Sequence, residues 1–281
     1  MSYLDRIRSC NRRDLSRYRP FQINGVHVGF VRQDMAEAVR PYADVFQVSE
    51  RTVVLNPELT NFEARTAAVD IVLRSLKSQE IMSPWRDGPY AVTPAFGAPA
   101  LFAMERAAVP LFGVRAYGVH LNGYVRRNGR ISMWIGRRSR DKHTYPGLLD
   151  NTVAGGLPYG MTAQECLVKE CEEEAGIAEN RANAASPVGA ITYCAETQEG
   201  LRPDVLFCYD LELPGDFRPV CHDGEIEEFR LMPIDEVAAI VRDTERFKFN
   251  CNLVIIDFLV RHGLIGPDEP DYVAIAQGLH Q

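Results

Sequence analysis

An acidic segment between residues 162 and 176 carries the side chains best suited to chemistry. Thr162 and Glu165 have the spacing of a capping box, so we expect a helix that begins near Ala163 and ends at Gly176. At ~100° per residue, three of its acids share a sector about 100° wide beside the apolar face: Glu170, Glu173 and Glu174. Like charges this close to a core need a counter-charge, and Mg²⁺ takes oxygen ligands. The pattern therefore predicts catalytic acids that hold Mg²⁺, with Mn²⁺ as an alternative.

Glycines precede this helix. Gly155, Gly156 and Gly160 lie between an expected strand end and the helix start, where a loop can bring backbone amides near an anion. Their spacing is neither that of a P-loop nor that of a dinucleotide-binding turn. A glutamate-rich helix without such glycines is more often a solvated face with no function. We therefore expect Gly155 and Gly156 to contact substrate.

Together these positions resemble the Nudix box, G-x5-E-x7-R-E-U-x-E-E-x-G-U, in which U is a bulky apolar residue. Gly155 and Gly176 match its outer glycines. Glu170, Glu173 and Glu174 match the three positions that hold divalent metal in Nudix hydrolases. The resemblance implies a metal-dependent diphosphate hydrolase, in which Glu170 or an acid from elsewhere is the general base.

Three residues depart from the box. Met161 replaces a glutamate that ties the loop to the helix, which puts the order of the loop in doubt more than the binding of metal. Lys169 replaces arginine; it keeps the positive charge expected of this catalytic position but cannot form a bidentate fork with a carboxylate. Cys171 fills the bulky apolar position.

Charged residues outside the box are further candidates. Arg137, Arg138 and Lys142 form a basic cluster that we expect to bind the distal phosphate, with ordinary solubility as the alternative. The family often contributes another acid from the segment that follows the helix. Here Glu225 is favoured over Glu228 as a metal ligand, and a merely charged edge strand is the alternative.

Lone histidines and two aromatic residues carry weaker signals. His120, His143 and His222 are isolated in the sequence, so surface or hydrogen-bonded roles are favoured over catalysis. Trp85 and Tyr90 are suited to stacking on a heteroaromatic ring, but core packing is the safer expectation.

Longer stretches are similar to the Nudix branch related to thiamine pyrophosphokinase fusions. These stretches are YPGLLDNTVAGG (145–156), KECEEEAG (169–176), PDVLFCYDLELP (203–214), DGEIEEFRLMPIDEV (223–237) and FKFNCNLVIIDFLVRHG (247–263). A weaker similarity is found at Trp85, Arg86, Asp87 and Tyr90. This resemblance implies hydrolysis of thiamine diphosphate, or an altered form of it, to the monophosphate and phosphate. The alternatives are a hydrolase of nucleotide-linked diphosphates, such as nucleotide sugars or dinucleotides, and a catalytically silent diphosphate-binding protein.

The elements that must position these residues alternate between strands and helices. Hydrophobic periodicity predicts helices at 62–76, 234–241 and 252–262, and loops at 84–99. It predicts strands at 117–126, 131–135, 188–194, 205–211 and 229–232. We therefore expect an α/β protein: a Nudix-type α/β/α sandwich with a mixed sheet at 111–281, preceded by a smaller α+β accessory domain at 1–110.

Composition limits the class of protein. A chain of 281 residues, of which 46% are hydrophobic and 25% charged, is globular rather than disordered. A net charge of −7 argues against a general nucleic-acid binder and leaves a small-molecule diphosphate as the expected partner, with a homodimer as a possibility. No apolar run approaches the ~18 residues that span a bilayer, so no membrane association is expected.

Cysteines and the N-terminus bear on the compartment. Seven scattered cysteines without a CxxC pair argue against a disulfide framework or a zinc cluster. Asp5 and Asp14 interrupt an arginine-rich N-terminus, which favours a surface helix over a transit peptide. We therefore expect a reducing, cytoplasmic location.

Overall fold

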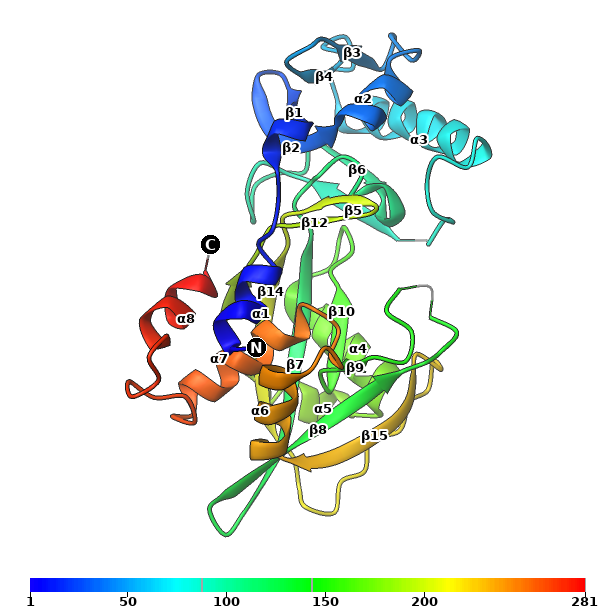
Figure 1. Cartoon of the computed structure of the whole chain (residues 1–281). Helices are drawn as coiled ribbons and strands as arrows, with labels where there is room; N and C mark the ends of the chain where they lie inside the picture. Colours follow the sequence, from blue (N-terminus) through cyan, green and yellow to red (C-terminus); the bar gives the residue numbers. More distant parts are fainter. Residues whose placement is uncertain (87, 143, 281) are drawn as a thin grey trace.

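A computed structural model describes residues 1–86, 88–142 and 144–280 (Figure 1). Two residues named in the sequence analysis lie outside the described residues: Asp87, from the weaker N-terminal similarity, and His143, one of the isolated histidines. Among the helices of the described ranges, none is long and apolar enough to cross a membrane.

The N-terminal part of the chain is a small sheet covered by helices. Its four strands pair in the order β2-β1-β4-β3: β1 (Tyr18–Ile23), β2 (Val26–Arg32), β3 (Phe46–Val48) and β4 (Val53–Leu55). Around them lie α2 (Gln33–Val39), α3 (Phe62–Ser78), the hairpin of β5 (Pro89–Val92) with β6 (Phe102–Glu105), and the short helices η1 (Leu15–Arg17) and η2 (Arg106–Ala108). Phe21, Phe46 and Phe112 meet at its centre, with ring centroids 5.5–6.1 Å apart. This part has the α+β character that the sequence predicts.

The rest of the chain is organised by a mixed sheet of seven strands. The order is β11-β14-β7-β8-β15, with β10 paired to β7 and β9 paired to β8. The strands are β7 (Tyr117–Arg127), β8 (Arg130–Arg138), β9 (Leu149–Asp150), β10 (Val153–Gly156), β11 (Ser186–Thr192), β14 (Val205–Glu212) and β15 (Ile226–Pro233). β14 runs parallel to β7, and the other pairs are antiparallel. Asn128 and Gly129 both have positive φ, as the predicted hairpin turn between β7 and β8 requires.

Helices cover both faces of this sheet because its strands are apolar on both sides. In β7, Val119 and Leu121 face a core with α4 (Ala163–Ala175) and α5 (Glu179–Ala182), and the alternate residues face the opposite side. On that side a larger core joins the sheet to α1 (Tyr3–Ser9), α6 (Ile234–Asp243), α7 (Cys251–Arg261) and α8 (Tyr272–Gly278). The arrangement confirms the predicted α/β/α sandwich.

Some local expectations were wrong. Residues 89–92, within the predicted loop region, form β5, which pairs with β6 although Pro89 opens it. The N-terminal helix α1 is not merely a surface helix, since Tyr3, Ile7 and even Arg6 are buried. α1 packs against α6, α7 and α8, at a distance from the N-terminal sheet (Figure 1). The boundary between residues 110 and 111 stays a prediction.

Candidate active site

Helix α4 has the ends that its sequence predicts. The Thr162 side chain accepts from the backbone N–H of Glu165, and the Glu165 side chain accepts from the backbone N–H of Thr162. Gly176 ends the helix with a left-handed φ of 62°. Leu167 and Cys171 are fully buried, so the apolar face fixes the rotation of the helix. That rotation decides how far each acid is exposed.

The three box glutamates have different surroundings. Glu174 is only 3% exposed, and its carboxylate accepts the backbone N–H of Ala154 at 2.8 Å. Glu170 is mostly buried, with its side chain against the backbone of Gly155. Glu173 is 43% exposed at its side chain and pairs with Lys169 at 2.5 Å. Two of the acids therefore lie at the sheet, and the third lies closer to solvent.

Burial makes the charged form of Glu170 and Glu174 unfavourable unless a cation lies nearby. It raises the pKa of Glu174 well above the usual value, and it also raises the pKa of Glu170. The described residues supply an ion pair to Glu170 from Lys169, but none to Glu174. A hard divalent cation would offset this cost, so these carboxylates fit the metal that the box implies. Glu225 adds to the negative potential at both acids.

The glycines before α4 do not form the loop that the sequence predicts. Gly155 and Gly156 do not form a loop around an anion; they are the last residues of β10, paired with Val119 and Gly118 of β7. A Cβ at Gly155 would overlap the side chain of Glu170. A glycine is needed here because the strand passes directly against the acid. Only Gly160, with a φ of 88°, lies in a turn.

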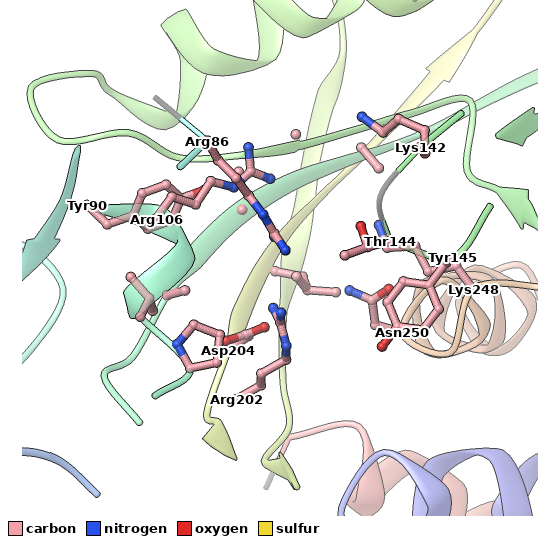
Figure 2. A pocket seen from close by; sticks show the side chains of 18 of the residues that line it. Arg86, Tyr90, Arg106, Lys142, Thr144, Tyr145, Arg202, Asp204, Lys248 and Asn250 are labelled. Carbon is pink, nitrogen blue, oxygen red and sulfur yellow. The ribbon is translucent and has the colours of Figure 1, made fainter. Parts of the chain in front are cut away.

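A cavity of about 500 Å³ lies beside β10. Ala154, Gly155 and Gly156 line one part of it, and Glu225 lines another. Figure 2 shows the side chains around it: Arg86, Tyr90 and Arg106 gather on one side, Lys142, Tyr145 and Lys248 on another, and Arg202 with Asp204 on a third. The lining carries more basic than acidic side chains, which suits an anionic ligand.

The predicted basic cluster is divided by the pleat of β8. Arg137 and Arg138 face opposite sides of the strand, so Arg137 pairs with Glu228 at 3.1 Å and does not line the cavity. Arg138 lines the cavity but is buried, and it pairs with Asp150 at 2.7 Å. Lys142 lines the cavity and pairs with Glu225. Lys142 is thus the member best placed to meet a ligand.

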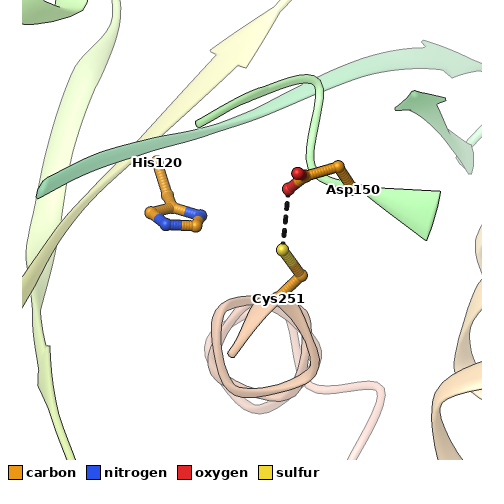
Figure 3. Close-up of side chains that lie close together, drawn as sticks. All are labelled: His120, Asp150 and Cys251. Carbon is orange, nitrogen blue, oxygen red and sulfur yellow. Dashed lines mark hydrogen bonds between the residues drawn. The ribbon is translucent and has the colours of Figure 1, made fainter. Parts of the chain in front are cut away.

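His120 has a hydrogen-bonded role, one of the two roles favoured over catalysis, within a cluster that sequence spacing does not reveal. It is buried on β7, where its Nδ1 lies 2.8 Å from Oδ1 of Asn151, and it lies close to Asp150 and Cys251 (Figure 3). The thiol of Cys251 donates to Asp150 at 2.7 Å. His222, in contrast, is exposed at the end of α4.

The cluster of His120, Asp150 and Cys251 fits a metal poorly. Burial alone raises the pKa of Asp150, but Lys248 and Arg138 outweigh that effect and hold it at about 2. A divalent cation here would therefore face two buried cations. Burial also lowers the pKa of His120 to about 4 and raises that of Cys251 well above the usual value, so both are neutral. We interpret the cluster as a structural network between β7, β9 and α7.

Several cavity residues were missed by the sequence. Arg106, Tyr193 and Arg202 line the cavity but stand in no recognisable motif, whereas Asp204 and Lys248 line it from stretches quoted for the family resemblance in which neither was singled out. Arg202 and Asp204 are two residues apart between β13 and β14, and the other three come from separate segments, so no single spacing connects the set. Arg202 ends β13 (Gly200–Arg202), which forms a hairpin with β12 (Ala195–Thr197). Trp85 and Tyr90, for which core packing was expected, also line the cavity.

Two family models match the chain. A family model described as NUDIX domain matches residues 118–252, and one described as Domain of unknown function (DUF4743) matches residues 2–116. The NUDIX domain of Shewanella oneidensis NrtR, complexed with ADP ribose, is 12% identical with a TM-score of 0.43, covering 55% of this chain and 91% of that one.

Two curated relatives align along nearly the whole chain. It is 46% identical over 288 residues to "Nudix hydrolase 20, chloroplastic" of Arabidopsis thaliana, and 47% identical over 281 residues to "Nudix hydrolase 24, chloroplastic" of the same plant. Each alignment covers 99% of this chain and 77% of the relative. The chain therefore belongs to the Nudix hydrolase family, whose members hydrolyse diphosphate linkages.

Proposed function

We propose that this protein is a Mg²⁺-dependent hydrolase of thiamine diphosphate, or of an altered form of it, which releases the monophosphate and phosphate. Mn²⁺ is the alternative metal. The observation that carries the proposal is the position of α4. Its two buried acids lie against β10, and the same strand lines a basic cavity large enough for a small organic diphosphate.

Charge gives a reason for placing the acids of α4 near a basic cavity, whose lining includes Glu225 and the glycines of β10 but not the three box glutamates. A diphosphate is repelled by carboxylates, so Glu170, Glu173, Glu174 and Glu225 would hold divalent metal, which would offset that repulsion. When bound, the metal lowers the pKa of water and stabilises charge on the transferred phosphoryl. Lys142 and Arg138 would attract the phosphates from the cavity side. Lys169 orients Glu173 and Glu170 through its ion pairs.

Aromatic lining supports a heteroaromatic leaving group. Tyr145, Tyr193 and Phe249 line the cavity together, and the ring of Phe249 lies 5.5 Å from each tyrosine ring, centroid to centroid. Such surfaces favour stacking on a flat ring. They would also accept a nucleobase, so a nucleotide-linked diphosphate is the second candidate.

A substrate panel tests the proposal. The full chain is incubated with Mg²⁺ or Mn²⁺ and thiamine diphosphate, oxidised thiamine diphosphates, nucleotide sugars and dinucleotides, and released phosphate and monophosphate are measured; EDTA serves as control. We expect the thiamine compounds to give the highest kcat/KM. Faster cleavage of nucleotide-linked compounds would favour the second candidate. Binding without cleavage of any compound would mean a silent diphosphate-binding protein.

Location and assembly are separate proposals. The printed names of the two Arabidopsis relatives call those proteins chloroplastic. For this chain we propose a cytoplasmic location, supported by free thiols at all seven cysteines. Fractionation of the source cells with antibody detection tests the proposed location.

A homodimer is likewise proposed, and light scattering of the purified chain tests it.

A further inference from the structure

The N-terminal domain contributes side chains to the cavity. Tyr90, on β5, and Arg106, at the start of η2, both line it, and both lie within the segment that matches the domain of unknown function. The guanidinium carbon of Arg106 lies 5.8 Å from the centroid of the Tyr90 ring (Figure 2). The two therefore form one group of donors on the N-terminal side of the cavity.

Strand β10 connects this group to α4. A Cβ at Gly156 would overlap the hydroxyl of Tyr90 and would lie 3.3 Å from Nη2 of Arg106. At the preceding residue, Gly155, a Cβ would overlap Glu170. Two successive glycines thus let the strand approach the catalytic helix on one face and the N-terminal donors on the other. No side chain intervenes at either position.

Contacts between the two parts of the chain fix this approach. The carbonyl of Pro89, next to Tyr90, accepts the backbone N–H of Tyr159 at 2.7 Å. On the other side of β10, the thiol of Cys166 on α4 donates to the carbonyl of Gly156 at 3.4 Å. These two contacts hold β5 and α4 against the segment that runs from β10 to Tyr159.

Both donors are available to a ligand. Within the described residues, the Arg106 guanidinium has no hydrogen bond and no ion pair, although Arg202, Arg86 and Arg138 in the same cavity each have an acidic partner. The Tyr90 hydroxyl likewise makes no hydrogen bond to a described residue. An arginine fork and a phenol together offer several N–H and O–H groups, the pattern that binds phosphate oxygens.

We propose that the N-terminal domain binds the phosphate oxygens of the substrate through Arg106 and Tyr90. This inference rests on the proposed diphosphate chemistry, and it gives the domain a direct part in the active site. The acids on α4 would hold the metal, while Arg106 and Tyr90 bind phosphate oxygens from the cavity side.

Calorimetric titration with methylenediphosphonate in the presence of Mg²⁺ tests the inference, because this probe cannot be hydrolysed. We expect Arg106→Ala to weaken binding at least ~10-fold, and Arg106→Lys to recover part of it since the charge is kept and the fork is lost. Tyr90→Phe keeps the ring and removes only the hydroxyl, and should weaken binding about 3-fold or more. Arg51→Ala removes an exposed arginine of the same domain, away from the cavity, and should bind as the wild type does.

Three outcomes would overturn the inference: wild-type protein that does not bind the probe, Arg106→Ala and Tyr90→Phe that bind within twofold of wild type, or an equal loss in Arg51→Ala. Circular dichroism confirms that each variant is folded. The proposed function fails separately, if the wild type cleaves no diphosphate. Arg106-dependent binding of the probe without any cleavage would keep the anion site and reject the thiamine diphosphate hydrolase.

Discussion

Glu174 illustrates how a single residue can oppose stability in order to serve function. Its carboxylate is buried without a basic partner among the described residues, and burial raises its pKa. For an acid whose pKa is raised in the folded state, the charged form costs folding free energy, so stability falls as the pH rises above the usual pKa of the acid. The cost is reasonable only if a cation occupies the site in the working enzyme.

Replacement of this acid should therefore have opposite effects on activity and on stability. We expect Glu174→Gln to lower kcat at least ~100-fold with Mg²⁺, because a proposed metal ligand is lost. Without metal, the same variant should gain about 1–3 kcal/mol in its free energy of unfolding, since no charge is buried. Glu173→Gln should lose activity similarly without this gain, because its side chain is half exposed.

Phosphate release and urea unfolding in EDTA measure the two effects. Glu172→Gln is the matched control, since Glu172 lies on the same helix but is exposed. It should change neither quantity. Full activity in both Glu173→Gln and Glu174→Gln would show that the metal site is assigned wrongly.

Gly155 allows a second prediction at a single residue. An added methyl group would overlap Glu170, and the strand or the acid would have to move. We expect Gly155→Ala to cost about 1–3 kcal/mol of stability and to lower kcat. At Gly266 a Cβ would meet nothing within 4 Å, so Gly266→Ala is the control. Thermal unfolding and phosphate release decide the matter; a fully stable and active Gly155→Ala would contradict the close contact.

At the scale of elements, sequence patterns predicted helix ends and turns correctly where the signal comes from neighbouring residues. The ends of α4 follow from a capping box and a glycine, and the β7–β8 hairpin follows from Asn128 and Gly129. The short strand β5 could not be predicted in the same way. Its pairing with β6, ten residues further on, overrides the proline at its first position.

The site was predicted only where a motif connects its residues. The acids of α4 share one helix face, so their spacing shows that they belong together. Arg106 and Asp204 reach the cavity from η2 and from the segment before β14, and only tertiary packing brings them together. Arg137 was misplaced for a local reason. Strand β8 extends to Arg138, beyond the predicted end at residue 135, so the pleat turns Arg137 away while its neighbour reaches the cavity.

The network that joins β7 and β9 to α7 should make stability depend on pH. Burial holds the pKa of His120 near 4, below the 6.5 of the unfolded chain. Between these values the unfolded chain takes up a proton and the folded chain does not, so stability falls as the pH falls from 6.5 to 4. The loss attributable to His120 is about 3 kcal/mol.

Urea unfolding at several pH values tests this. We expect His120→Gln to show a smaller loss of stability between pH 6.5 and pH 4 than the wild type. His27→Gln, which changes an exposed histidine on β2, should keep the slope of the wild type. Equal slopes in His120→Gln and wild type would mean that His120 takes up a proton as readily in the folded chain as in the unfolded chain.

For the whole molecule, the path of the chain makes the two parts depend on each other. α1 lies at the start of the sequence, yet its apolar face completes the core formed by α6, α7 and α8. The chain then continues into the N-terminal sheet and returns at β7. The cavity in turn needs Tyr90 and Arg106 from the N-terminal part. Neither part is complete alone.

Ile7 on α1 offers the last prediction. It is 1% exposed within the core of the C-terminal helices, so Ile7→Ala should lower the free energy of unfolding by about 2–5 kcal/mol. Hydrogen exchange should then show faster opening in α7 and α8, far along the sequence, while α3 of the N-terminal part keeps its protection. Ile71→Ala is the matched control, since Ile71 is 68% exposed on α3, and it should stay within about 0.5 kcal/mol of wild type. If Ile7→Ala instead loosened α3 and left α7 unchanged, α1 would belong to the N-terminal part after all.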